Sequence, residues 1–216
     1  MNRVIPYSGE VYAYLLAGYR DAYLAIEIAA CLAIAALLVA GGRAGRPVWR
    51  IGAVALAAIW LWLGVGFYWQ SYEPLNWAGR YLGWAAILQA ALVMIWGAVA
   101  GRFQPASRLA TFRQWLATAV LVLSALAGPL VGLFSGGAVV ALQAVGVTPL
   151  ATMAATLALL LLNRSPGPLW LLPVPAFLLA WEAIRAGTLG LMQDGVLVAV
   201  AAVVLVLVAW PAEKSR

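Results

Sequence analysis

Seven charged residues of this chain lie inside or at the edge of strongly apolar segments, where a charge without a partner costs the most free energy. They are Arg20, Asp21, Glu27, Glu73, Arg80, Glu182 and Arg185. Carboxylates and guanidinium groups that gather in one place could bind a cation, a proton or a polar head group. The same side chains could instead neutralise one another in pairs that fix helix register, and we favour this structural interpretation.

The spacing of these charges predicts which of them meet. Glu27 follows Arg20 by two helical turns on a similar face, and Glu182 and Arg185 are three residues apart on a predicted helix. Glu27 is also the deepest acid in its apolar segment. We therefore single it out as the residue around which an outward-facing ion site would form.

Several chemistries are excluded by residue types alone. The chain has no histidine, a single cysteine at Cys31 and a single lysine, Lys214, near its C-terminus. These counts exclude an imidazole-ligated metal or haem site, an intrachain disulfide and a Schiff base within the apolar segments. We expect no catalytic residues, no metal site and no cofactor, so the chain is not predicted to be an enzyme.

An aromatic group could form a stacking pocket for a quinone or a pigment. Its members are Trp60, Trp62, Phe67, Tyr68, Trp69 and Tyr72. We favour the alternative in which these rings face lipid and anchor the chain at the membrane interface.

Composition places these residues in a membrane protein. Hydrophobic residues make up 66% of the 216 residues and charged residues only 9%, which cannot give a wettable globular surface. We expect one integral membrane domain over residues 1–216, with the lipid bilayer as its main partner. The net charge of +6 comes from arginines beside membrane ends, so nucleic-acid binding is not expected.

The apolar segments predict an all-α, polytopic transmembrane helix bundle of six to seven spans. The predicted spans are 22–40, 51–69, 81–100, 115–134, 148–162, 169–184 and 196–210. Residues 138–145 are expected to form a short outer, surface or re-entrant segment. The N-terminus lacks the order of a cleaved signal peptide, so the first span is expected to remain in the protein.

Charge asymmetry between the connectors predicts the orientation. Nine of the 13 Lys and Arg residues fall in alternate connectors and the C-terminal tail, and the positive-inside rule places these segments in the cytoplasm. We therefore expect the N-terminus outside and the C-terminus inside, in a bacterial inner membrane.

Two series of glycines could let helices approach closely. They are Gly97 with Gly101, and Gly128 with Gly132 and Gly136, each spaced by four residues so that its members share one helical face. We interpret both series as packing faces.

Several spaced blocks resemble a bacterial family of integral membrane proteins, the domain of unknown function family 6064. These blocks are YRDAYLAIE at 19–27, WLWLGVGFYWQSYEPLN at 60–76, GPLVGL at 128–133, GVTP at 146–149 and LGLMQD at 189–194. In the family pattern, histidines stand near Tyr68 and Gly137, a Cys-Pro pair stands at Leu150 and Ala151, and glutamine stands at Glu27. The resemblance implies a divergent member and a shared fold, but no activity.

Two functions remain open. The first is a non-catalytic accessory or structural subunit that packs against a larger membrane complex or forms a homo-oligomer. The alternative is a small-solute or ion transporter with an outward-facing carboxylate site around Glu27.

Overall fold

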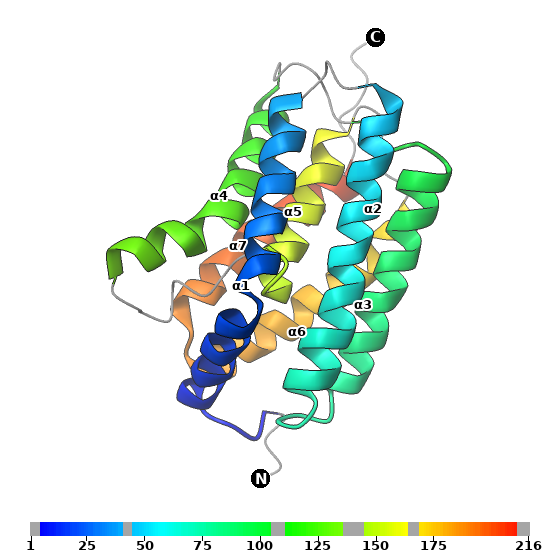
Figure 1. Cartoon of the computed structure of the whole chain (residues 1–216). Coiled ribbons are helices and arrows are strands. Elements are labelled where there is room, and N and C mark those ends of the chain that lie inside the picture. The colour runs from blue at the N-terminus through cyan, green and yellow to red at the C-terminus, as the bar shows by residue number, and fades with distance from the viewer. Residues whose placement is uncertain (1–4, 41–44, 105–110, 136–144, 164–168, 211–216) are drawn as a thin grey trace.

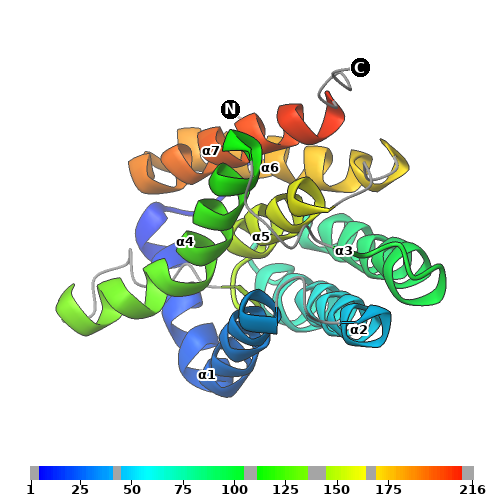
Figure 2. The same ribbon diagram turned by 90° about the horizontal axis from the view of Figure 1, so that it is seen from above.

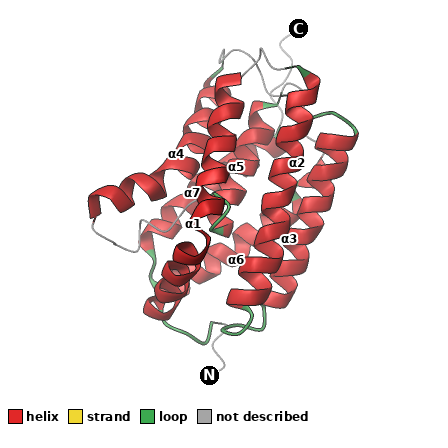
Figure 3. Cartoon of the chain, in the orientation of Figure 1, coloured by secondary structure: helices red, strands yellow, loops and turns green. Residues whose placement is uncertain are grey.

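The protein is helical throughout the part of the chain that its computed structural model describes, namely residues 5–40, 45–104, 111–135, 145–163 and 169–210 (Figure 3). This part contains seven α-helices. They are α1 Gly9–Ala40, α2 Arg46–Trp62, α3 Gly79–Val93, α4 Phe112–Ser135, α5 Pro149–Leu162, α6 Pro173–Leu189 and α7 Met192–Ala209. The all-α prediction is confirmed for these residues.

Within the described residues, three continuous helical segments are long and apolar enough to cross a membrane. They are Arg46–Tyr72, Gly79–Val99 and Leu169–Leu189, of 27, 21 and 21 residues and with mean hydropathies of 1.9, 1.9 and 1.4. At about 1.5 Å per residue, 21 residues reach the ~30 Å of a bilayer's hydrocarbon core. Shorter apolar helices cover Phe112–Leu126, Pro149–Leu162 and Asp194–Ala209.

The elements run between two ends of a tilted bundle. In Figure 1, α1 begins at the lower end, and the turn before α3, which follows the helical segment η2 (Leu63–Tyr72), lies at that same end. The start of α2 and the end of η3 (Met94–Val99), which follows α3, lie toward the upper end. The described ends of α2, α3 and η3 therefore lie alternately at the two ends of the bundle.

The first helix differs from its prediction. It begins at Gly9 instead of residue 22, directly after Ser8, whose carbonyl oxygen accepts a hydrogen bond from the backbone N–H of Tyr12 at 3.1 Å. Charged residues in its first half lower the local hydropathy. The apolar pattern therefore predicted only the second half of the helix. A non-helical residue, Tyr23 (φ −126°, ψ 24°), bends α1 into the two parts visible in Figure 1.

Helix α5 occupies the centre of the bundle, with the other α-helices arranged around it in Figure 2. Every residue of α5 except Leu161 is buried, as expected for a helix that is apolar on all sides and is surrounded by protein. Its 14 residues span about 21 Å, which is less than the ~30 Å hydrocarbon core. The described residues before it, 145–148, are buried and turn at Gly146 (φ +84°), whose N–H donates to Thr152 Oγ1 at 2.9 Å.

Two of the predicted spans change their winding before they end. Helix α2 continues as a π-helical segment, η2 (Leu63–Tyr72), and α3 continues as η3. The i+5 spacing of π-helical hydrogen bonds persists where these segments end, with Glu73 N–H donating to the Tyr68 carbonyl at 2.8 Å. Sequence periodicity assumed one regular α-helix and missed both segments.

Gly97 lets η3, the continuation of α3, lie close to α2. A Cβ atom built on Gly97 would lie only 2.5 Å from the Cβ of Ala53, so Gly97 packs within the chain itself. Gly101 has φ +61° and ends η3 beside the Arg50 side chain. Gly128 and Gly132 lie in α4, but their surroundings fall outside the described part of the structure. Gly136 and residues 138–144 of the predicted segment 138–145 also lie outside the described residues, while its last residue, Val145, is buried.

Candidate functional site

Arg20 and Glu27 pair within α1, as their spacing predicted. Arg20 Nε lies 2.8 Å from Glu27 Oε2, and Arg20 Nη2 lies 3.2 Å from Glu27 Oε1. The Glu27 residue is only 1% exposed, whereas the Arg20 side chain is 18% exposed. The bend at Tyr23 lies between the two residues. This geometry neutralises the deepest acid of the first helix with a cation from the same helix.

A second ion pair, formed by Glu73 and Arg80, lies at the surface of the bundle. Arg80 Nη2 is 2.9 Å from Glu73 Oε1, and the Arg80 side chain is 67% exposed. Asp21 is also exposed. An exposed pair of this kind contributes little to stability, so these residues are poor candidates for a buried ion site.

The third pair belongs to a larger buried cluster than the sequence predicted. Glu182 and Arg185 form the expected pair on α6, and Arg185 Nη2 also donates to Asp194 Oδ2 of α7 at 2.9 Å. These three residues are 2%, 1% and 7% exposed. Two carboxylates therefore converge on a single nitrogen of one guanidinium group. We call Glu182, Arg185 and Asp194 the buried charge cluster.

The turn between α6 and α7 brings Asp194 to this position. Gly190 (φ +68°) ends α6, and the N–H of Leu191 donates to the Ala186 carbonyl at 3.0 Å. The chain then reverses, and α7 starts at Met192 with Asp194 in its first turn. The sequence analysis did not place Asp194 among the seven charged candidate residues. The signal that could have found it was the glycine between two apolar helices, with an acid just after it.

Tyrosines surround the buried charge cluster. The Cζ atom of Arg185 lies 4.0 Å from the centre of the Tyr12 ring, in a cation–π contact. The hydroxyl of Tyr7 donates to that of Tyr72 at 2.6 Å. Burial and this contact with Tyr72 raise the pKa of Tyr7, which precedes α1, well above its ordinary value. Tyr7 is therefore neutral at physiological pH.

The aromatic group of the second span is largely internal. Trp60, Phe67, Tyr68 and Tyr72 are at most 1% exposed, so the preferred interpretation that these rings face lipid was wrong for them. Inside the bundle, the Phe67 ring contacts the rings of Tyr19, Tyr68 and Tyr72, and Trp60 Nε1 donates to Thr156 Oγ1 of α5. In the described part of the chain, no three His, Cys, Asp or Glu residues lie together as a metal site.

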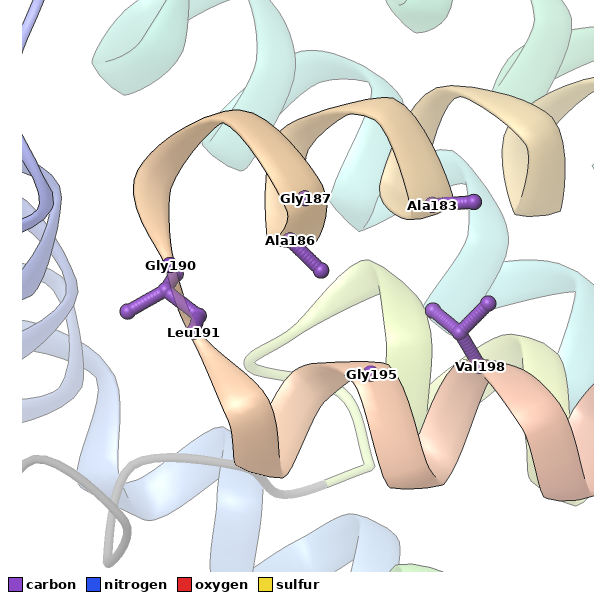
Figure 4. A pocket seen from close by; sticks show the side chains of 7 residues that line it. All are labelled: Ala183, Ala186, Gly187, Gly190, Leu191, Gly195 and Val198. Carbon is purple, nitrogen blue, oxygen red and sulfur yellow. The ribbon is translucent and has the colours of Figure 1, made fainter.

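An open groove lies between α6 and α7 (Figure 4). Its volume is about 370 Å³, and it is lined by Ala183, Ala186, Gly187, Gly190, Leu191, Gly195 and Val198. A Cβ atom built on Gly187 or Gly195 would meet nothing within 4 Å. Five of the seven lining residues are alanine or glycine, so the helix backbones themselves form much of the groove wall. We call it the α6–α7 groove.

Comparison with known proteins places the chain in a family. The model of a family of unknown function, DUF6064, matches residues 9–216. The chain belongs to this family. The resemblance seen in the sequence blocks is thereby confirmed over α1 to α7 and beyond. No curated protein and no solved structure matches the chain. The description of DUF6064 names no activity.

Proposed function

We propose that this DUF6064 protein is a non-catalytic, multi-pass membrane protein that packs as an accessory subunit against another integral membrane protein. The α6–α7 groove is the observation that carries this proposal. Three helical segments with the length and hydropathy of membrane spans support the membrane assignment, and one of them, Leu169–Leu189, forms a wall of the groove.

The groove has the properties of a helix-packing surface. Ala183 and Gly187 are exposed and four residues apart, so they lie on one face of α6. Within a bilayer, small residues on one face let the backbone of a second helix approach closely, and this close packing drives association. The occupant that suits an open, apolar groove beside a membrane span is a transmembrane helix of a partner subunit.

The charged residues support a structural role for the rest of the bundle. Glu27 is held by two hydrogen bonds from Arg20, and Glu73 is paired with Arg80. A carboxylate that is already neutralised within its own helix gains little from binding a transported cation. The alternative function, transport at Glu27, therefore has weaker support.

Substitution in the groove tests the accessory role. Gly187→Leu fills the groove, while Gly18→Leu makes the same change at an exposed helical glycine of α1 that also has open space around it. We expect native mass spectrometry in mild detergent to find the wild-type protein and the Gly18→Leu variant with one partner at fixed stoichiometry. The Gly187→Leu variant should lose that partner. A solitary wild-type protein, a second copy in place of a partner, or an unaffected Gly187→Leu complex would contradict the proposal.

A second test addresses the alternative function. Under the accessory role, Glu27→Gln should leave folding and partner binding intact, because a neutral amide can still accept a hydrogen bond from Arg20. Loss of an ion-coupled uptake by this variant, with normal folding, would instead favour transport.

We further propose that the chain crosses a bacterial inner membrane with six to seven spans, the N-terminus outside and the C-terminus inside. The uneven distribution of arginine between the connectors supports this orientation. In a Cys31→Ser background, a cysteine placed beside Arg46 should resist a membrane-impermeant reagent added to intact cells. Labelling of that cysteine from outside would reverse the proposed topology.

A further inference from the structure

Three arginines gather at the upper end of the bundle, where α2 starts and η3 ends (Figure 1). Arg46 and Arg50 lie in the first two turns of α2, and Arg102 follows η3. All three residues are exposed, and none of them forms an ion pair within the described part of the chain. We call Arg46, Arg50 and Arg102 the basic platform.

The fold holds these cations at one place. Gly101 (φ +61°) ends η3, and a Cβ atom built on it would lie 2.9 Å from Nε and 3.0 Å from Nη2 of Arg50. The guanidinium group of Arg50 therefore lies against the backbone next to Arg102. The backbone of Arg102 is itself fixed, because its N–H donates to the Trp96 carbonyl and its carbonyl accepts from Asn163 Nδ2, both at 3.2 Å.

Electrostatics at the basic platform favours an anion. Arg46 and Arg50 are four residues apart on one helical face, where like charges repel each other. Both lie near the N-terminus of α2, where the helix dipole disfavours positive charge, and the first turn contains no acidic residue. A negative group bound here would offset both the repulsion and the dipole.

Apolar surface continues from the basic platform along both helical segments. Val54 lies one turn beyond Arg50 on the same face of α2, and Val99 is the last residue of η3. Val54 is 45% exposed and Val99 is 70% exposed. Both belong to segments with the length and hydropathy of membrane spans, so in a bilayer these side chains would contact acyl chains. A phosphate head group with lipid tails therefore fits this surface better than a soluble anion does.

We propose that the basic platform binds the phosphate head group of an anionic phospholipid, whose acyl chains lie along α2 and η3. Arginine suits this role because its guanidinium group can donate two parallel hydrogen bonds to phosphate oxygens. The methylene stem of each arginine can pack on apolar surface while its charged end reaches the head group. This inference rests on the proposed membrane location, but neither on the accessory role nor on the α6–α7 groove.

Native mass spectrometry of the delipidated protein tests this by titration with two lipids that have the same acyl chains. We expect dioleoylphosphatidylglycerol, which is anionic, to bind at least ~tenfold more tightly than zwitterionic dioleoylphosphatidylcholine. Arg50→Gln and Arg102→Gln should each weaken binding of the anionic lipid about fivefold, which corresponds to about 1 kcal/mol per arginine. Arg80→Gln is the matched control and should leave binding unchanged, because it removes an exposed arginine that pairs with Glu73.

Equal binding of the two lipids by the wild-type protein would overturn the inference, and so would undiminished binding by both platform variants. An equal loss in Arg80→Gln would show that the lipid responds to net charge and not to the basic platform. Inorganic phosphate that displaces the lipid would show that a soluble anion is the ligand. A protein that stays in solution without detergent would contradict the membrane location itself, which separates that failure from the others.

Discussion

Replacing Arg185 by methionine should be among the most destabilising single changes in this protein. Methionine preserves much of the side-chain length but removes the cation that faces Glu182 and Asp194. Removing one partner of a buried ion pair costs about 3–5 kcal/mol, because the remaining charge is left uncompensated. The cation–π contact with Tyr12 is lost at the same time, and a contact of this kind contributes roughly 2 kcal/mol when desolvated.

Arg80→Met is the matched control, since it makes the same chemical change in an exposed pair. The Arg80 side chain is 67% exposed, so its pairing with Glu73 should be worth about 0–1 kcal/mol. The two variants should therefore differ by at least ~2 kcal/mol, which is more than a tenfold difference in the unfolding equilibrium.

Reversible unfolding by sodium dodecyl sulfate in mixed micelles, followed by tryptophan fluorescence, measures both free energies. A third variant, in which Arg185→Met is combined with Glu182→Gln and Asp194→Asn, should recover much of the lost stability, because the cost arises from charge. The reasoning fails if Arg185→Met lies within about 1 kcal/mol of Arg80→Met. It also fails if the triple variant is no more stable than Arg185→Met alone.

Three further predictions use the same unfolding measurement. Gly190→Ala should lower the free energy of unfolding by about 1–2 kcal/mol more than Gly187→Ala does. Both sites have open space, but only Gly190 has a left-handed backbone, with φ +68°. Equal effects of the two substitutions would contradict this prediction. Thr156→Val should cost about 1–3 kcal/mol by removing the acceptor that lies 2.9 Å from the buried Trp60 Nε1, and an unchanged stability would show that this hydrogen bond contributes little. Gly97→Ala should cost about 1–3 kcal/mol, because its new Cβ would lie 2.5 Å from the nearest Cβ of α2; a neutral effect would mean that α2 and η3 separate easily.

Local spacing was sufficient to predict two of the ion pairs in α-helices. Glu182 and Arg185 are three residues apart, so a regular helix brings them to one face. Arg20 and Glu27 are seven residues apart and meet with the bend at Tyr23 between them. The apolar segments likewise predicted helices, because a backbone without water must satisfy its hydrogen bonds internally. The sequence blocks also identified the family, which the match over residues 9–216 confirmed.

Sequence alone could not rank the apolar helices by their position in the bundle. Central α5 is as apolar as a lipid-facing span would be, since lipid and protein interior favour the same side chains. The burial of Phe67, Tyr68 and Tyr72 had the same ambiguity, because an aromatic ring suits both a membrane interface and a protein interior.

Composition and local periodicity thus predicted that the chain is helical, roughly where its apolar segments lie and which charges can pair within one helix. Only the tertiary structure added Asp194 to Arg185 and placed the Tyr12 ring over the guanidinium group. Those contacts depend on the chain reversal at Gly190 and on the packing of α1 against η2. Helix spacing fixes neighbours along one helix, whereas turns and packing faces decide which helices meet.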